Sequence, residues 1–219
     1  MQYQNKIAVI GGTGKSGIFL TRELIRQNIP IRILLRDPST YPARSLPVDI
    51  VPGDVRDPAA VLNLTEGCSA IISTLGQPKG EAPVFSQATR NVLAAMQIRQ
   101  IRRYILTTGL NVDTPMDRKG PVTQAGTDWM KQHYAATTTD KQLEYELLAA
   151  SGIDWTLVRL PLIGVTADSA PVNTSLLDCP GTGIHGIDLA RFLIFQLEDK
   201  AYISQAPFLA NCNLTPGES

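Results

Sequence analysis

The chain is poor in the residues that build metal sites and disulfide frameworks. Its 219 residues include three cysteines, Cys68, Cys179 and Cys212, and two histidines, His133 and His185. Three widely spaced thiols form neither a disulfide framework nor a zinc knuckle. The two histidines are far apart and lack the i,i+4 spacing of a zinc-binding helix. We therefore expect no metal and no structural disulfide.

An excess of charge and a long apolar run are absent as well. Twenty basic and twenty acidic residues give a formal net charge of +0, and no lysine- or arginine-rich block stands out. This balance argues against nucleic acid as the main partner. No apolar run approaches the roughly 20 residues of a membrane span, and the amino terminus lacks a signal-peptide pattern. We expect a cytoplasmic protein that binds a small molecule, as a monomer or a homodimer, with no membrane partner.

A glycine-rich segment, Gly11–Gly17, follows the apolar run Ile7–Ile10 and precedes the helical pattern of Ile18–Gln27. In a dinucleotide-binding βαβ unit, glycines at 11, 14 and 17 permit the tight turn, the approach of the backbone to the phosphates and close helix packing. The first N–H groups of the helix then face the pyrophosphate. A P-loop would need a glycine five residues before Gly14, where Val9 stands, so we reject that alternative.

The second apolar run, Ile31–Leu35, ends at Arg36, about 20 residues after the last glycine, where such a unit meets the adenine ribose. An arginine there favours the 2′-phosphate of NADP, with Lys15 and Ser16 as helpers. Asp37 beside it keeps NAD open as an alternative. Asp54 and Val55 follow the third apolar run and would supply an acceptor and an apolar wall near the adenine, although such a triplet with Gly53 is also a common helix cap.

Strand-length apolar runs alternate with helical patterns along the whole chain. This alternation predicts an α/β fold of the Rossmann type, a doubly wound parallel β-sheet with helices on both faces, in one domain over residues 1–219. The expected strands are Ile7–Ile10, Ile31–Leu35, Val48–Val51, Ala70–Ser73, Tyr104–Thr107 and Trp155–Val158, and further helices are expected in Pro83–Gln100 and Asp188–Leu197.

Ligands of such a sheet lie beyond the carboxyl ends of the strands. The residues at these ends are small, glycine-rich or hydroxyl-bearing, and the cofactor candidates among them are Gly11, Thr13, Gly14, Lys15, Ser16, Gly17, Arg36, Asp54, Val55, Thr74, Leu75, Gly76, Thr107, Pro161 and Ile163. Two irregular stretches, residues 110–125 and 165–183, also follow strand ends, and we expect them to act as substrate loops.

These motifs resemble those of the atypical short-chain dehydrogenase/reductases, the NAD(P)H-binding group that includes NmrA-like proteins and biliverdin-IXβ/flavin reductases. The matching segments are Ile10–Gly14 with Gly17, Leu35–Pro38, Gly53–Val55, Thr107–Gly109, Ser151–Arg159 and Ile187–Phe192. The resemblance implies that hydride leaves the nicotinamide near Thr108, whose place in related enzymes is taken by a serine or threonine that binds a substrate oxygen. It also implies that Lys141 touches the nicotinamide ribose, whereas a solvent-facing lysine is the alternative.

The chain departs from the alcohol-handling members of the group, because no tyrosine is followed four residues later by a lysine. The sequence therefore predicts an NADP-dependent oxidoreductase that passes hydride to a small conjugated acceptor, such as a flavin, a quinone or a tetrapyrrole. A non-catalytic NADP(H) sensor of the NmrA-like type is the main alternative. A nucleotide-sugar epimerase ranks last, since it needs the missing tyrosine.

Overall fold

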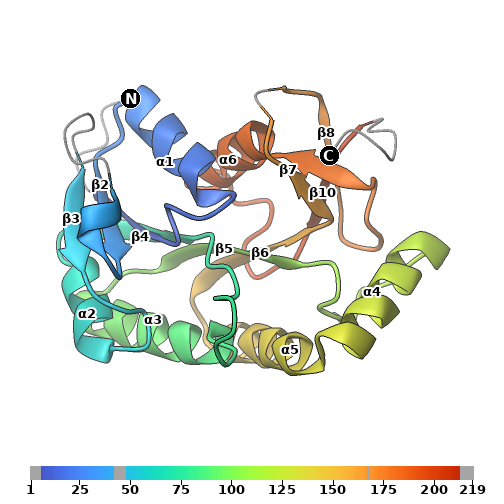
Figure 1. The fold of residues 1–219 in the computed structure, drawn as a ribbon, viewed down its shortest axis with the longest axis horizontal. Coiled ribbons are helices and arrows are strands. Elements are labelled where there is room, and N and C mark those ends of the chain that lie inside the picture. Colours follow the sequence, from blue (N-terminus) through green and yellow to red (C-terminus); the bar gives the residue numbers. More distant parts are fainter. Residues whose placement is uncertain (1–5, 42–47, 167, 213–219) are drawn as a thin grey trace.

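The computed structural model describes residues 6–41, 48–166 and 168–212. The predicted domain reaches beyond these ranges at both ends, and residue 167 of the second predicted loop also lies outside them. The described chain contains ten strands and six α-helices, and strands alternate with helices in its first half (Figure 1). The strands are β1 (Lys6–Ile10), β2 (Ile31–Leu35), β3 (Asp49–Pro52), β4 (Cys68–Ser73), β5 (Arg103–Gly109), β6 (Asp154–Leu160), β7 (Leu162–Gly164), β8 (Val172–Ser175), β9 (Gly183–His185) and β10 (Phe208–Asn211).

The central sheet has eight strands in the order β3-β2-β1-β4-β5-β6-β10-β8. All neighbouring strands are parallel except β8, which runs antiparallel to β10 at one edge. The strand order reverses direction between β1 and β4, and this switch point is where doubly wound sheets bind ligands. A small second sheet joins β7 to β9.

Helices cover both faces of the sheet and give it two hydrophobic cores. One face carries α1 (Gly17–Arg26) and α6 (Gly186–Phe195), and the other carries α2 (Pro58–Leu64), α3 (Phe85–Arg99) and α5 (Ala135–Ala149) (Figure 1). The central strands are apolar on both faces, since each face is covered. Within β1, Ile7 and Val9 belong to one core and Ala8 and Ile10 to the other. This three-layer arrangement confirms the predicted fold class.

The helix α4 (Pro121–His133) projects from the body of the molecule beside α5 (Figure 1). This helix begins inside the stretch 110–125, which the sequence predicts to be irregular. Pro121 stands in its first turn, where proline is favoured. The stretch 165–183 likewise contains a strand, β8, which extends the sheet through hydrogen bonds with β10. Among the described helices, none is long and apolar enough to cross a membrane.

Candidate functional site

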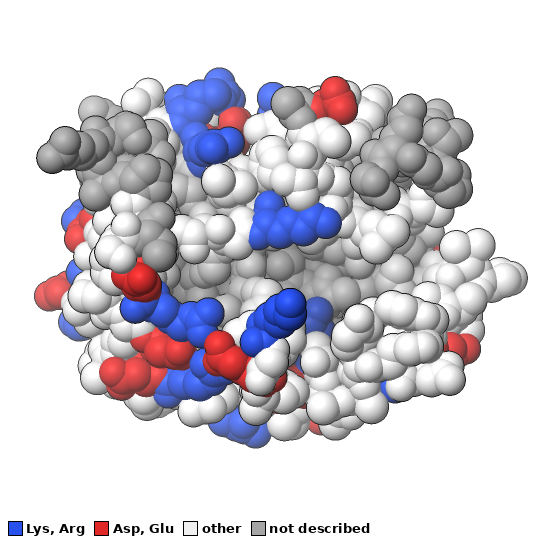
Figure 2. Space-filling view, in the orientation of Figure 1, with Lys and Arg blue, Asp and Glu red and all other residues white. Residues whose placement is uncertain are grey.

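A groove of about 580 Å³ runs along the carboxyl ends of β1, β2, β3 and β4. Its walls come from segments far apart in the chain, brought together by the parallel sheet. It is lined by Ile10, Gly11, Thr13, Gly14, Lys15, Leu34, Leu35, Arg36, Asp37, Gly53, Asp54, Val55, Arg56, Leu75, Gly76, Gln77, Pro78 and Val84. Figure 2 shows a hollow in the middle of one face with lysine and arginine side chains around it.

The glycine-rich turn has a backbone that only glycine fits at two positions. Gly11 has a φ of +73°, and a β-carbon there would lie 2.7 Å from the carbonyl oxygen of Thr74. A β-carbon on Gly17 would lie 2.0 Å from the carbonyl oxygen of Gly11, so the first turn of α1 packs directly on the loop. This cradle, open at Gly14 and Lys15, fits the pyrophosphate of a dinucleotide at a helix N-terminus.

Thr74 holds the turn from behind. Its backbone N–H donates to the carbonyl of Ile10 at 2.9 Å, and its hydroxyl donates to the carbonyl of Gly11 at 3.2 Å. Because Thr74 is buried, it supports the glycine-rich turn from behind and does not line the groove. Ser16 is also buried, at the N-terminus of α1, and its side chain makes no capping hydrogen bond.

Nine of the predicted cofactor residues line this groove: Gly11, Thr13, Gly14, Lys15, Arg36, Asp54, Val55, Leu75 and Gly76. The lining also includes Gln77, which follows Gly76 at the same strand end, and Arg56, which sequence reasoning missed. The sequence spacing could have indicated Arg56, because it follows the predicted Asp54 by two residues. In the structure, the backbone N–H of Arg56 donates to the Asp54 carboxylate at 2.8 Å.

The other candidates lie behind or beyond the groove. Ser16, Gly17 and Thr74 support the turn, as described above. Thr107 is half-buried at the end of β5, and Pro161 and Ile163 follow the neighbouring strand β6. Ile163 pairs with Ile184 in the small sheet and packs on the core beneath α1 and α6. These residues therefore stand further along the same carboxyl edge, past the switch point.

Two residues at the end of β5 and just beyond it have buried polar atoms without partners. The hydroxyl of Thr108 is buried and has no hydrogen-bond partner within the described protein, and the same is true of Asn111 Oδ1. A methyl group added at Gly109 would lie 2.3 Å from that Asn111 oxygen and 3.7 Å from Lys141 Nζ, so these two groups flank Gly109. Buried polar atoms without partners are costly. Their presence at a strand end is typical of a place where a ligand completes the hydrogen bonds.

Lys141 points inward from α5, contrary to the solvent-facing alternative. Its side chain is only partly exposed, and its ammonium lies 4.8 Å from the centre of the Phe85 ring. Burial lowers the pKa of this amine, while the nearby Glu144 carboxyl raises it. Asn111, which sequence reasoning missed, donates from Nδ2 to the hydroxyl of Thr138 at 3.0 Å.

Glu144 is a second buried ionisable group, one turn along α5 from Lys141. One carboxylate oxygen accepts a hydrogen bond from the Thr89 hydroxyl at 2.9 Å, and the other has no partner within the described residues. Burial raises the pKa of Glu144 to about 7, although Thr89 and Lys141 both act to lower it. In turn, burial and the Glu144 carboxyl raise the pKa of the Tyr104 phenol. No local sequence pattern predicts this cluster of Glu144, Thr89 and Tyr104.

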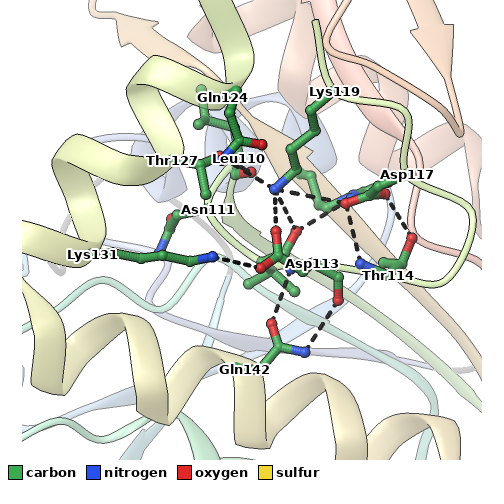
Figure 3. A network of polar contacts seen from close by, with 12 residues as sticks. Leu110, Asn111, Asp113, Thr114, Asp117, Lys119, Gln124, Thr127, Lys131 and Gln142 are labelled. Atoms are coloured by element: carbon green, nitrogen blue, oxygen red, sulfur yellow. Dashed lines mark hydrogen bonds and ion pairs between the residues drawn. The ribbon is translucent and has the colours of Figure 1, made fainter. Parts of the chain in front are cut away.

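The loop after β5 is fixed by a polar network around Asp113 (Figure 3). The Asp113 carboxylate accepts from Lys119 Nζ at 2.6 Å and from Lys131 Nζ at 2.8 Å. Its backbone N–H and carbonyl bond to the side-chain amide of Gln142 at 2.9 and 3.1 Å. These contacts tie the first predicted substrate loop to α4 and α5. The loop is therefore held at several points along its length, in addition to its two ends.

Arg159, the last residue of the Ser151–Arg159 motif, contacts both predicted substrate loops. Its side chain is fully buried and lies 3.6 Å from the centre of the Phe208 ring. One guanidinium nitrogen donates to Asp117 at 2.6 Å, and another donates to the carbonyl of Leu176 at 3.2 Å. Arg159 thus positions both loops over the carboxyl edge of the sheet.

The remaining candidate ligand residues form no metal site. No group of three or more histidine, cysteine, aspartate or glutamate side chains within the described ranges is arranged to hold an ion. The three cysteines are free and half-buried, and burial raises the pKa of the Cys68 thiol to about 11. His133 stacks on Trp129 with ring centres 4.6 Å apart, on an exposed part of α4.

The geometry agrees with what comparison with known proteins shows. Residues 11–200 match the family model described as NAD(P)H-binding. The chain therefore belongs to the NAD(P)H-binding family, which confirms the resemblance drawn from its motifs. A protein provisionally named dihydroflavonol 4-reductase, from Synechocystis, is 34% identical over 110 residues. That match covers 47% of this chain but only 32% of the relative.

Solved structures share the fold over nearly the whole chain. The anaerobilin reductase ChuY from Escherichia coli O157:H7 superimposes with a TM-score of 0.79, covering 97% of this chain and 100% of that one at 20% identity. A short-chain dehydrogenase/reductase from Veillonella parvula, solved in complex with NADP, has a TM-score of 0.76 at 14% identity and covers 98% of this chain and 96% of its own. At these identities the likeness concerns the fold.

Proposed function

We propose that this protein is an NADP-dependent oxidoreductase that transfers hydride from NADPH to a small conjugated acceptor, such as a flavin, a quinone or a tetrapyrrole. The observation that carries the proposal is the pair of unsatisfied buried oxygens of Thr108 and Asn111, together with the Lys141 ammonium, which lies near the Asn111 oxygen at Gly109. They lie at the end of β5, two strands from the glycine-rich turn on β1. A family that binds NAD(P)H places its reactive end beyond the switch point of this edge.

The cofactor supplies the hydride, and the chain supplies orientation and electrostatics. The Thr108 hydroxyl donates a hydrogen bond to an oxygen of the acceptor, and the Lys141 ammonium stabilises negative charge that develops there. Lys141 has no tyrosine to activate, because the Tyr-x-x-x-Lys pair is absent. An acceptor with an extended conjugated ring needs no strong general base, since solvent can supply the proton after hydride transfer. This chemistry fits a flavin, quinone or tetrapyrrole better than a simple ketone.

The preference for NADP rests on Arg36, which lines the groove where β2 ends. A guanidinium binds a 2′-phosphate through paired hydrogen bonds that a 2′-hydroxyl cannot replace. Arg36→Asp is therefore expected to weaken NADPH binding at least tenfold more than NADH binding. Equal losses for the two cofactors, measured by titration calorimetry, would remove the 2′-phosphate argument. The NADP complex of the Veillonella relative supports the choice.

A redox sensor that binds NADP(H) without turnover is the second candidate, favoured by the missing Tyr-x-x-x-Lys pair. Consumption of NADPH separates the two functions. We would follow NADPH absorbance with flavin mononucleotide, a quinone and a tetrapyrrole, each against a control without protein. A reductase consumes NADPH with one of them, and Lys141→Ala lowers its kcat. Lys200→Ala, at an exposed position between α6 and β10, serves as the matched control. Binding of NADPH without consumption by any acceptor would favour the sensor.

A further inference from the structure

The outer end of the groove carries an ion-pair bridge that the proposed function does not use. Glu81 places one carboxylate oxygen 2.7 Å from Arg36 Nη1 and the other 2.8 Å from Arg56 Nη2. Arg56 makes a further ion pair with Asp54 at 3.2 Å. Two guanidinium groups therefore converge on a single carboxylate, and both of them line the groove.

The segment that carries Glu81 is held in place by its own backbone. Glu81 belongs to the connection between β4 and α3, where its N–H donates to the carbonyl of Pro78 at 3.3 Å. The side-chain amide of Gln77, which lines the groove, donates to the carbonyl of Glu81 at 2.9 Å. The position of Glu81 at the rim is thus set by a turn, while its side chain remains 39% exposed to solvent.

The charges of the side chains explain why this bridge forms. Hydrogen bonding to Arg36 lowers the pKa of Glu81, so its carboxylate is ionised at neutral pH. The same contact raises the pKa of Arg36. The four groups joined by these ion pairs, two guanidinium groups and two carboxylates, sum to zero charge. An anion that replaces Glu81 would meet two fixed donors in a fork arrangement suited to phosphate.

We propose that Glu81 is a specificity-determining residue that fills an anion site formed by Arg36 and Arg56, and that the 2′-phosphate of the cofactor displaces it. The inference rests on the proposed use of NADP and adds Arg56 and Glu81 to the specificity site. A 2′-phosphate carries enough charge to exchange with the carboxylate, because it is an anion with three acceptor oxygens. A 2′-hydroxyl is not charged and leaves the Glu81 bridge intact. Glu81 thus makes the site respond to the charge at the 2′ position.

The test uses 2′,5′-ADP and 5′-AMP as probes, because these fragments of NADP and NAD differ only by the 2′-phosphate and carry no nicotinamide. Titration calorimetry of the full chain gives both affinities. Glu81→Gln removes the competing charge, and we expect 2′,5′-ADP to bind about fivefold more tightly, as for removal of one like charge near 4 Å in water. 5′-AMP binding should change less than twofold. Glu66→Gln, which alters the net charge equally but lies beside Arg32, is the matched control.

Arg56→Gln tests the second arm of the site. We expect it to weaken 2′,5′-ADP binding about fivefold and to leave 5′-AMP binding within twofold, since Arg56 would contact only the 2′-phosphate. Arg102→Gln is its control, because Arg102 pairs with Asp154 at the opposite, amino-terminal edge of the sheet. Circular dichroism of both variants shows whether each remains folded.

The outcomes separate this inference from the proposed function. Unchanged or weaker binding of 2′,5′-ADP to Glu81→Gln overturns the inference, and weaker binding of 5′-AMP overturns it too, because Glu81 would then hold the ribose hydroxyls. Equal affinity of the wild-type protein for both probes contradicts the NADP preference, yet a gain for 2′,5′-ADP in Glu81→Gln would still support the role of Glu81. A wild-type protein that binds neither probe overturns both.

Discussion

The buried carboxyl of Glu144 should make the stability of this protein fall as pH rises. Its side chain is 3% exposed, and one oxygen has no partner in the described structure. Burial raises the pKa from 4.5 to about 7 in the folded state. We predict that Glu144→Gln, which keeps the shape and the acceptor for Thr89 but cannot ionise, removes this pH dependence.

The sign follows from the two pKa values. Below pH 4.5 the carboxyl is protonated in the folded and the unfolded chain, and its burial costs no ionisation energy. Between pH 4.5 and about 7 the unfolded chain releases the proton first, so the free energy of unfolding falls as pH rises. Above pH 7 the loss is complete. A pKa raised by about 2.5 corresponds to about 3 kcal/mol.

Urea denaturation of both proteins between pH 4.5 and pH 8 measures this effect. The free energy of unfolding of Glu144→Gln minus that of the wild type should grow by about 3 kcal/mol over this range, because the contributions of all other groups cancel. Glu146→Gln is the control, since Glu146 is exposed on the same helix. A difference that stays constant with pH would refute the burial of an ionisable Glu144.

Three further predictions follow from buried contacts. Gly17→Ala should lower the free energy of unfolding by about 1–3 kcal/mol and weaken NADPH binding, because its β-carbon would lie 2.0 Å from a loop carbonyl, whereas Gly76→Ala, with nothing within 4 Å, should leave urea stability unchanged. Arg159→Met should cost about 3–5 kcal/mol by leaving Asp117 without its partner at 2.6 Å, and urea stability near that of the wild type would contradict this. Thr108→Val should leave the melting temperature within a few degrees, since the lost hydroxyl has no protein partner, while kcat falls at least tenfold; unchanged kcat would remove Thr108 from the reaction.

Much of the fold could be predicted because its signals are local. The strands β1 to β6 coincide with apolar runs that are followed by glycine, proline, threonine or a charged residue, and each expected strand lies within two residues of the observed one. The start of α2 is also marked in the sequence, because Asp57 is a favoured N-cap residue and Pro58 follows it. In the structure, the Asp57 side chain accepts a hydrogen bond from the N–H of Ala59. By contrast, β10 is four residues long and β8 pairs with it in antiparallel fashion, so only tertiary contacts define this edge.

The site was predictable where glycine or charge had to stand at a strand end, and less so where packing decides. Gly11, Arg36 and Asp54 follow directly from the spacing of a βαβ unit and line the groove. Glu144 depends on Thr89, 55 positions away on another helix, and nothing in the local sequence marks it as buried. The bridge of Glu81 is equally non-local, because it joins three separate connections of the sheet.

We propose that the groove from the glycine-rich turn to Arg36 holds a nicotinamide dinucleotide. A calorimetric titration of the purified protein with NADPH and NADH, repeated with Gly17→Ala, tests this directly. We expect saturable binding of one NADPH per chain, tighter than that of NADH, and a marked loss of affinity in the variant. Absence of binding by either cofactor, or binding that Gly17→Ala leaves unchanged, would contradict it.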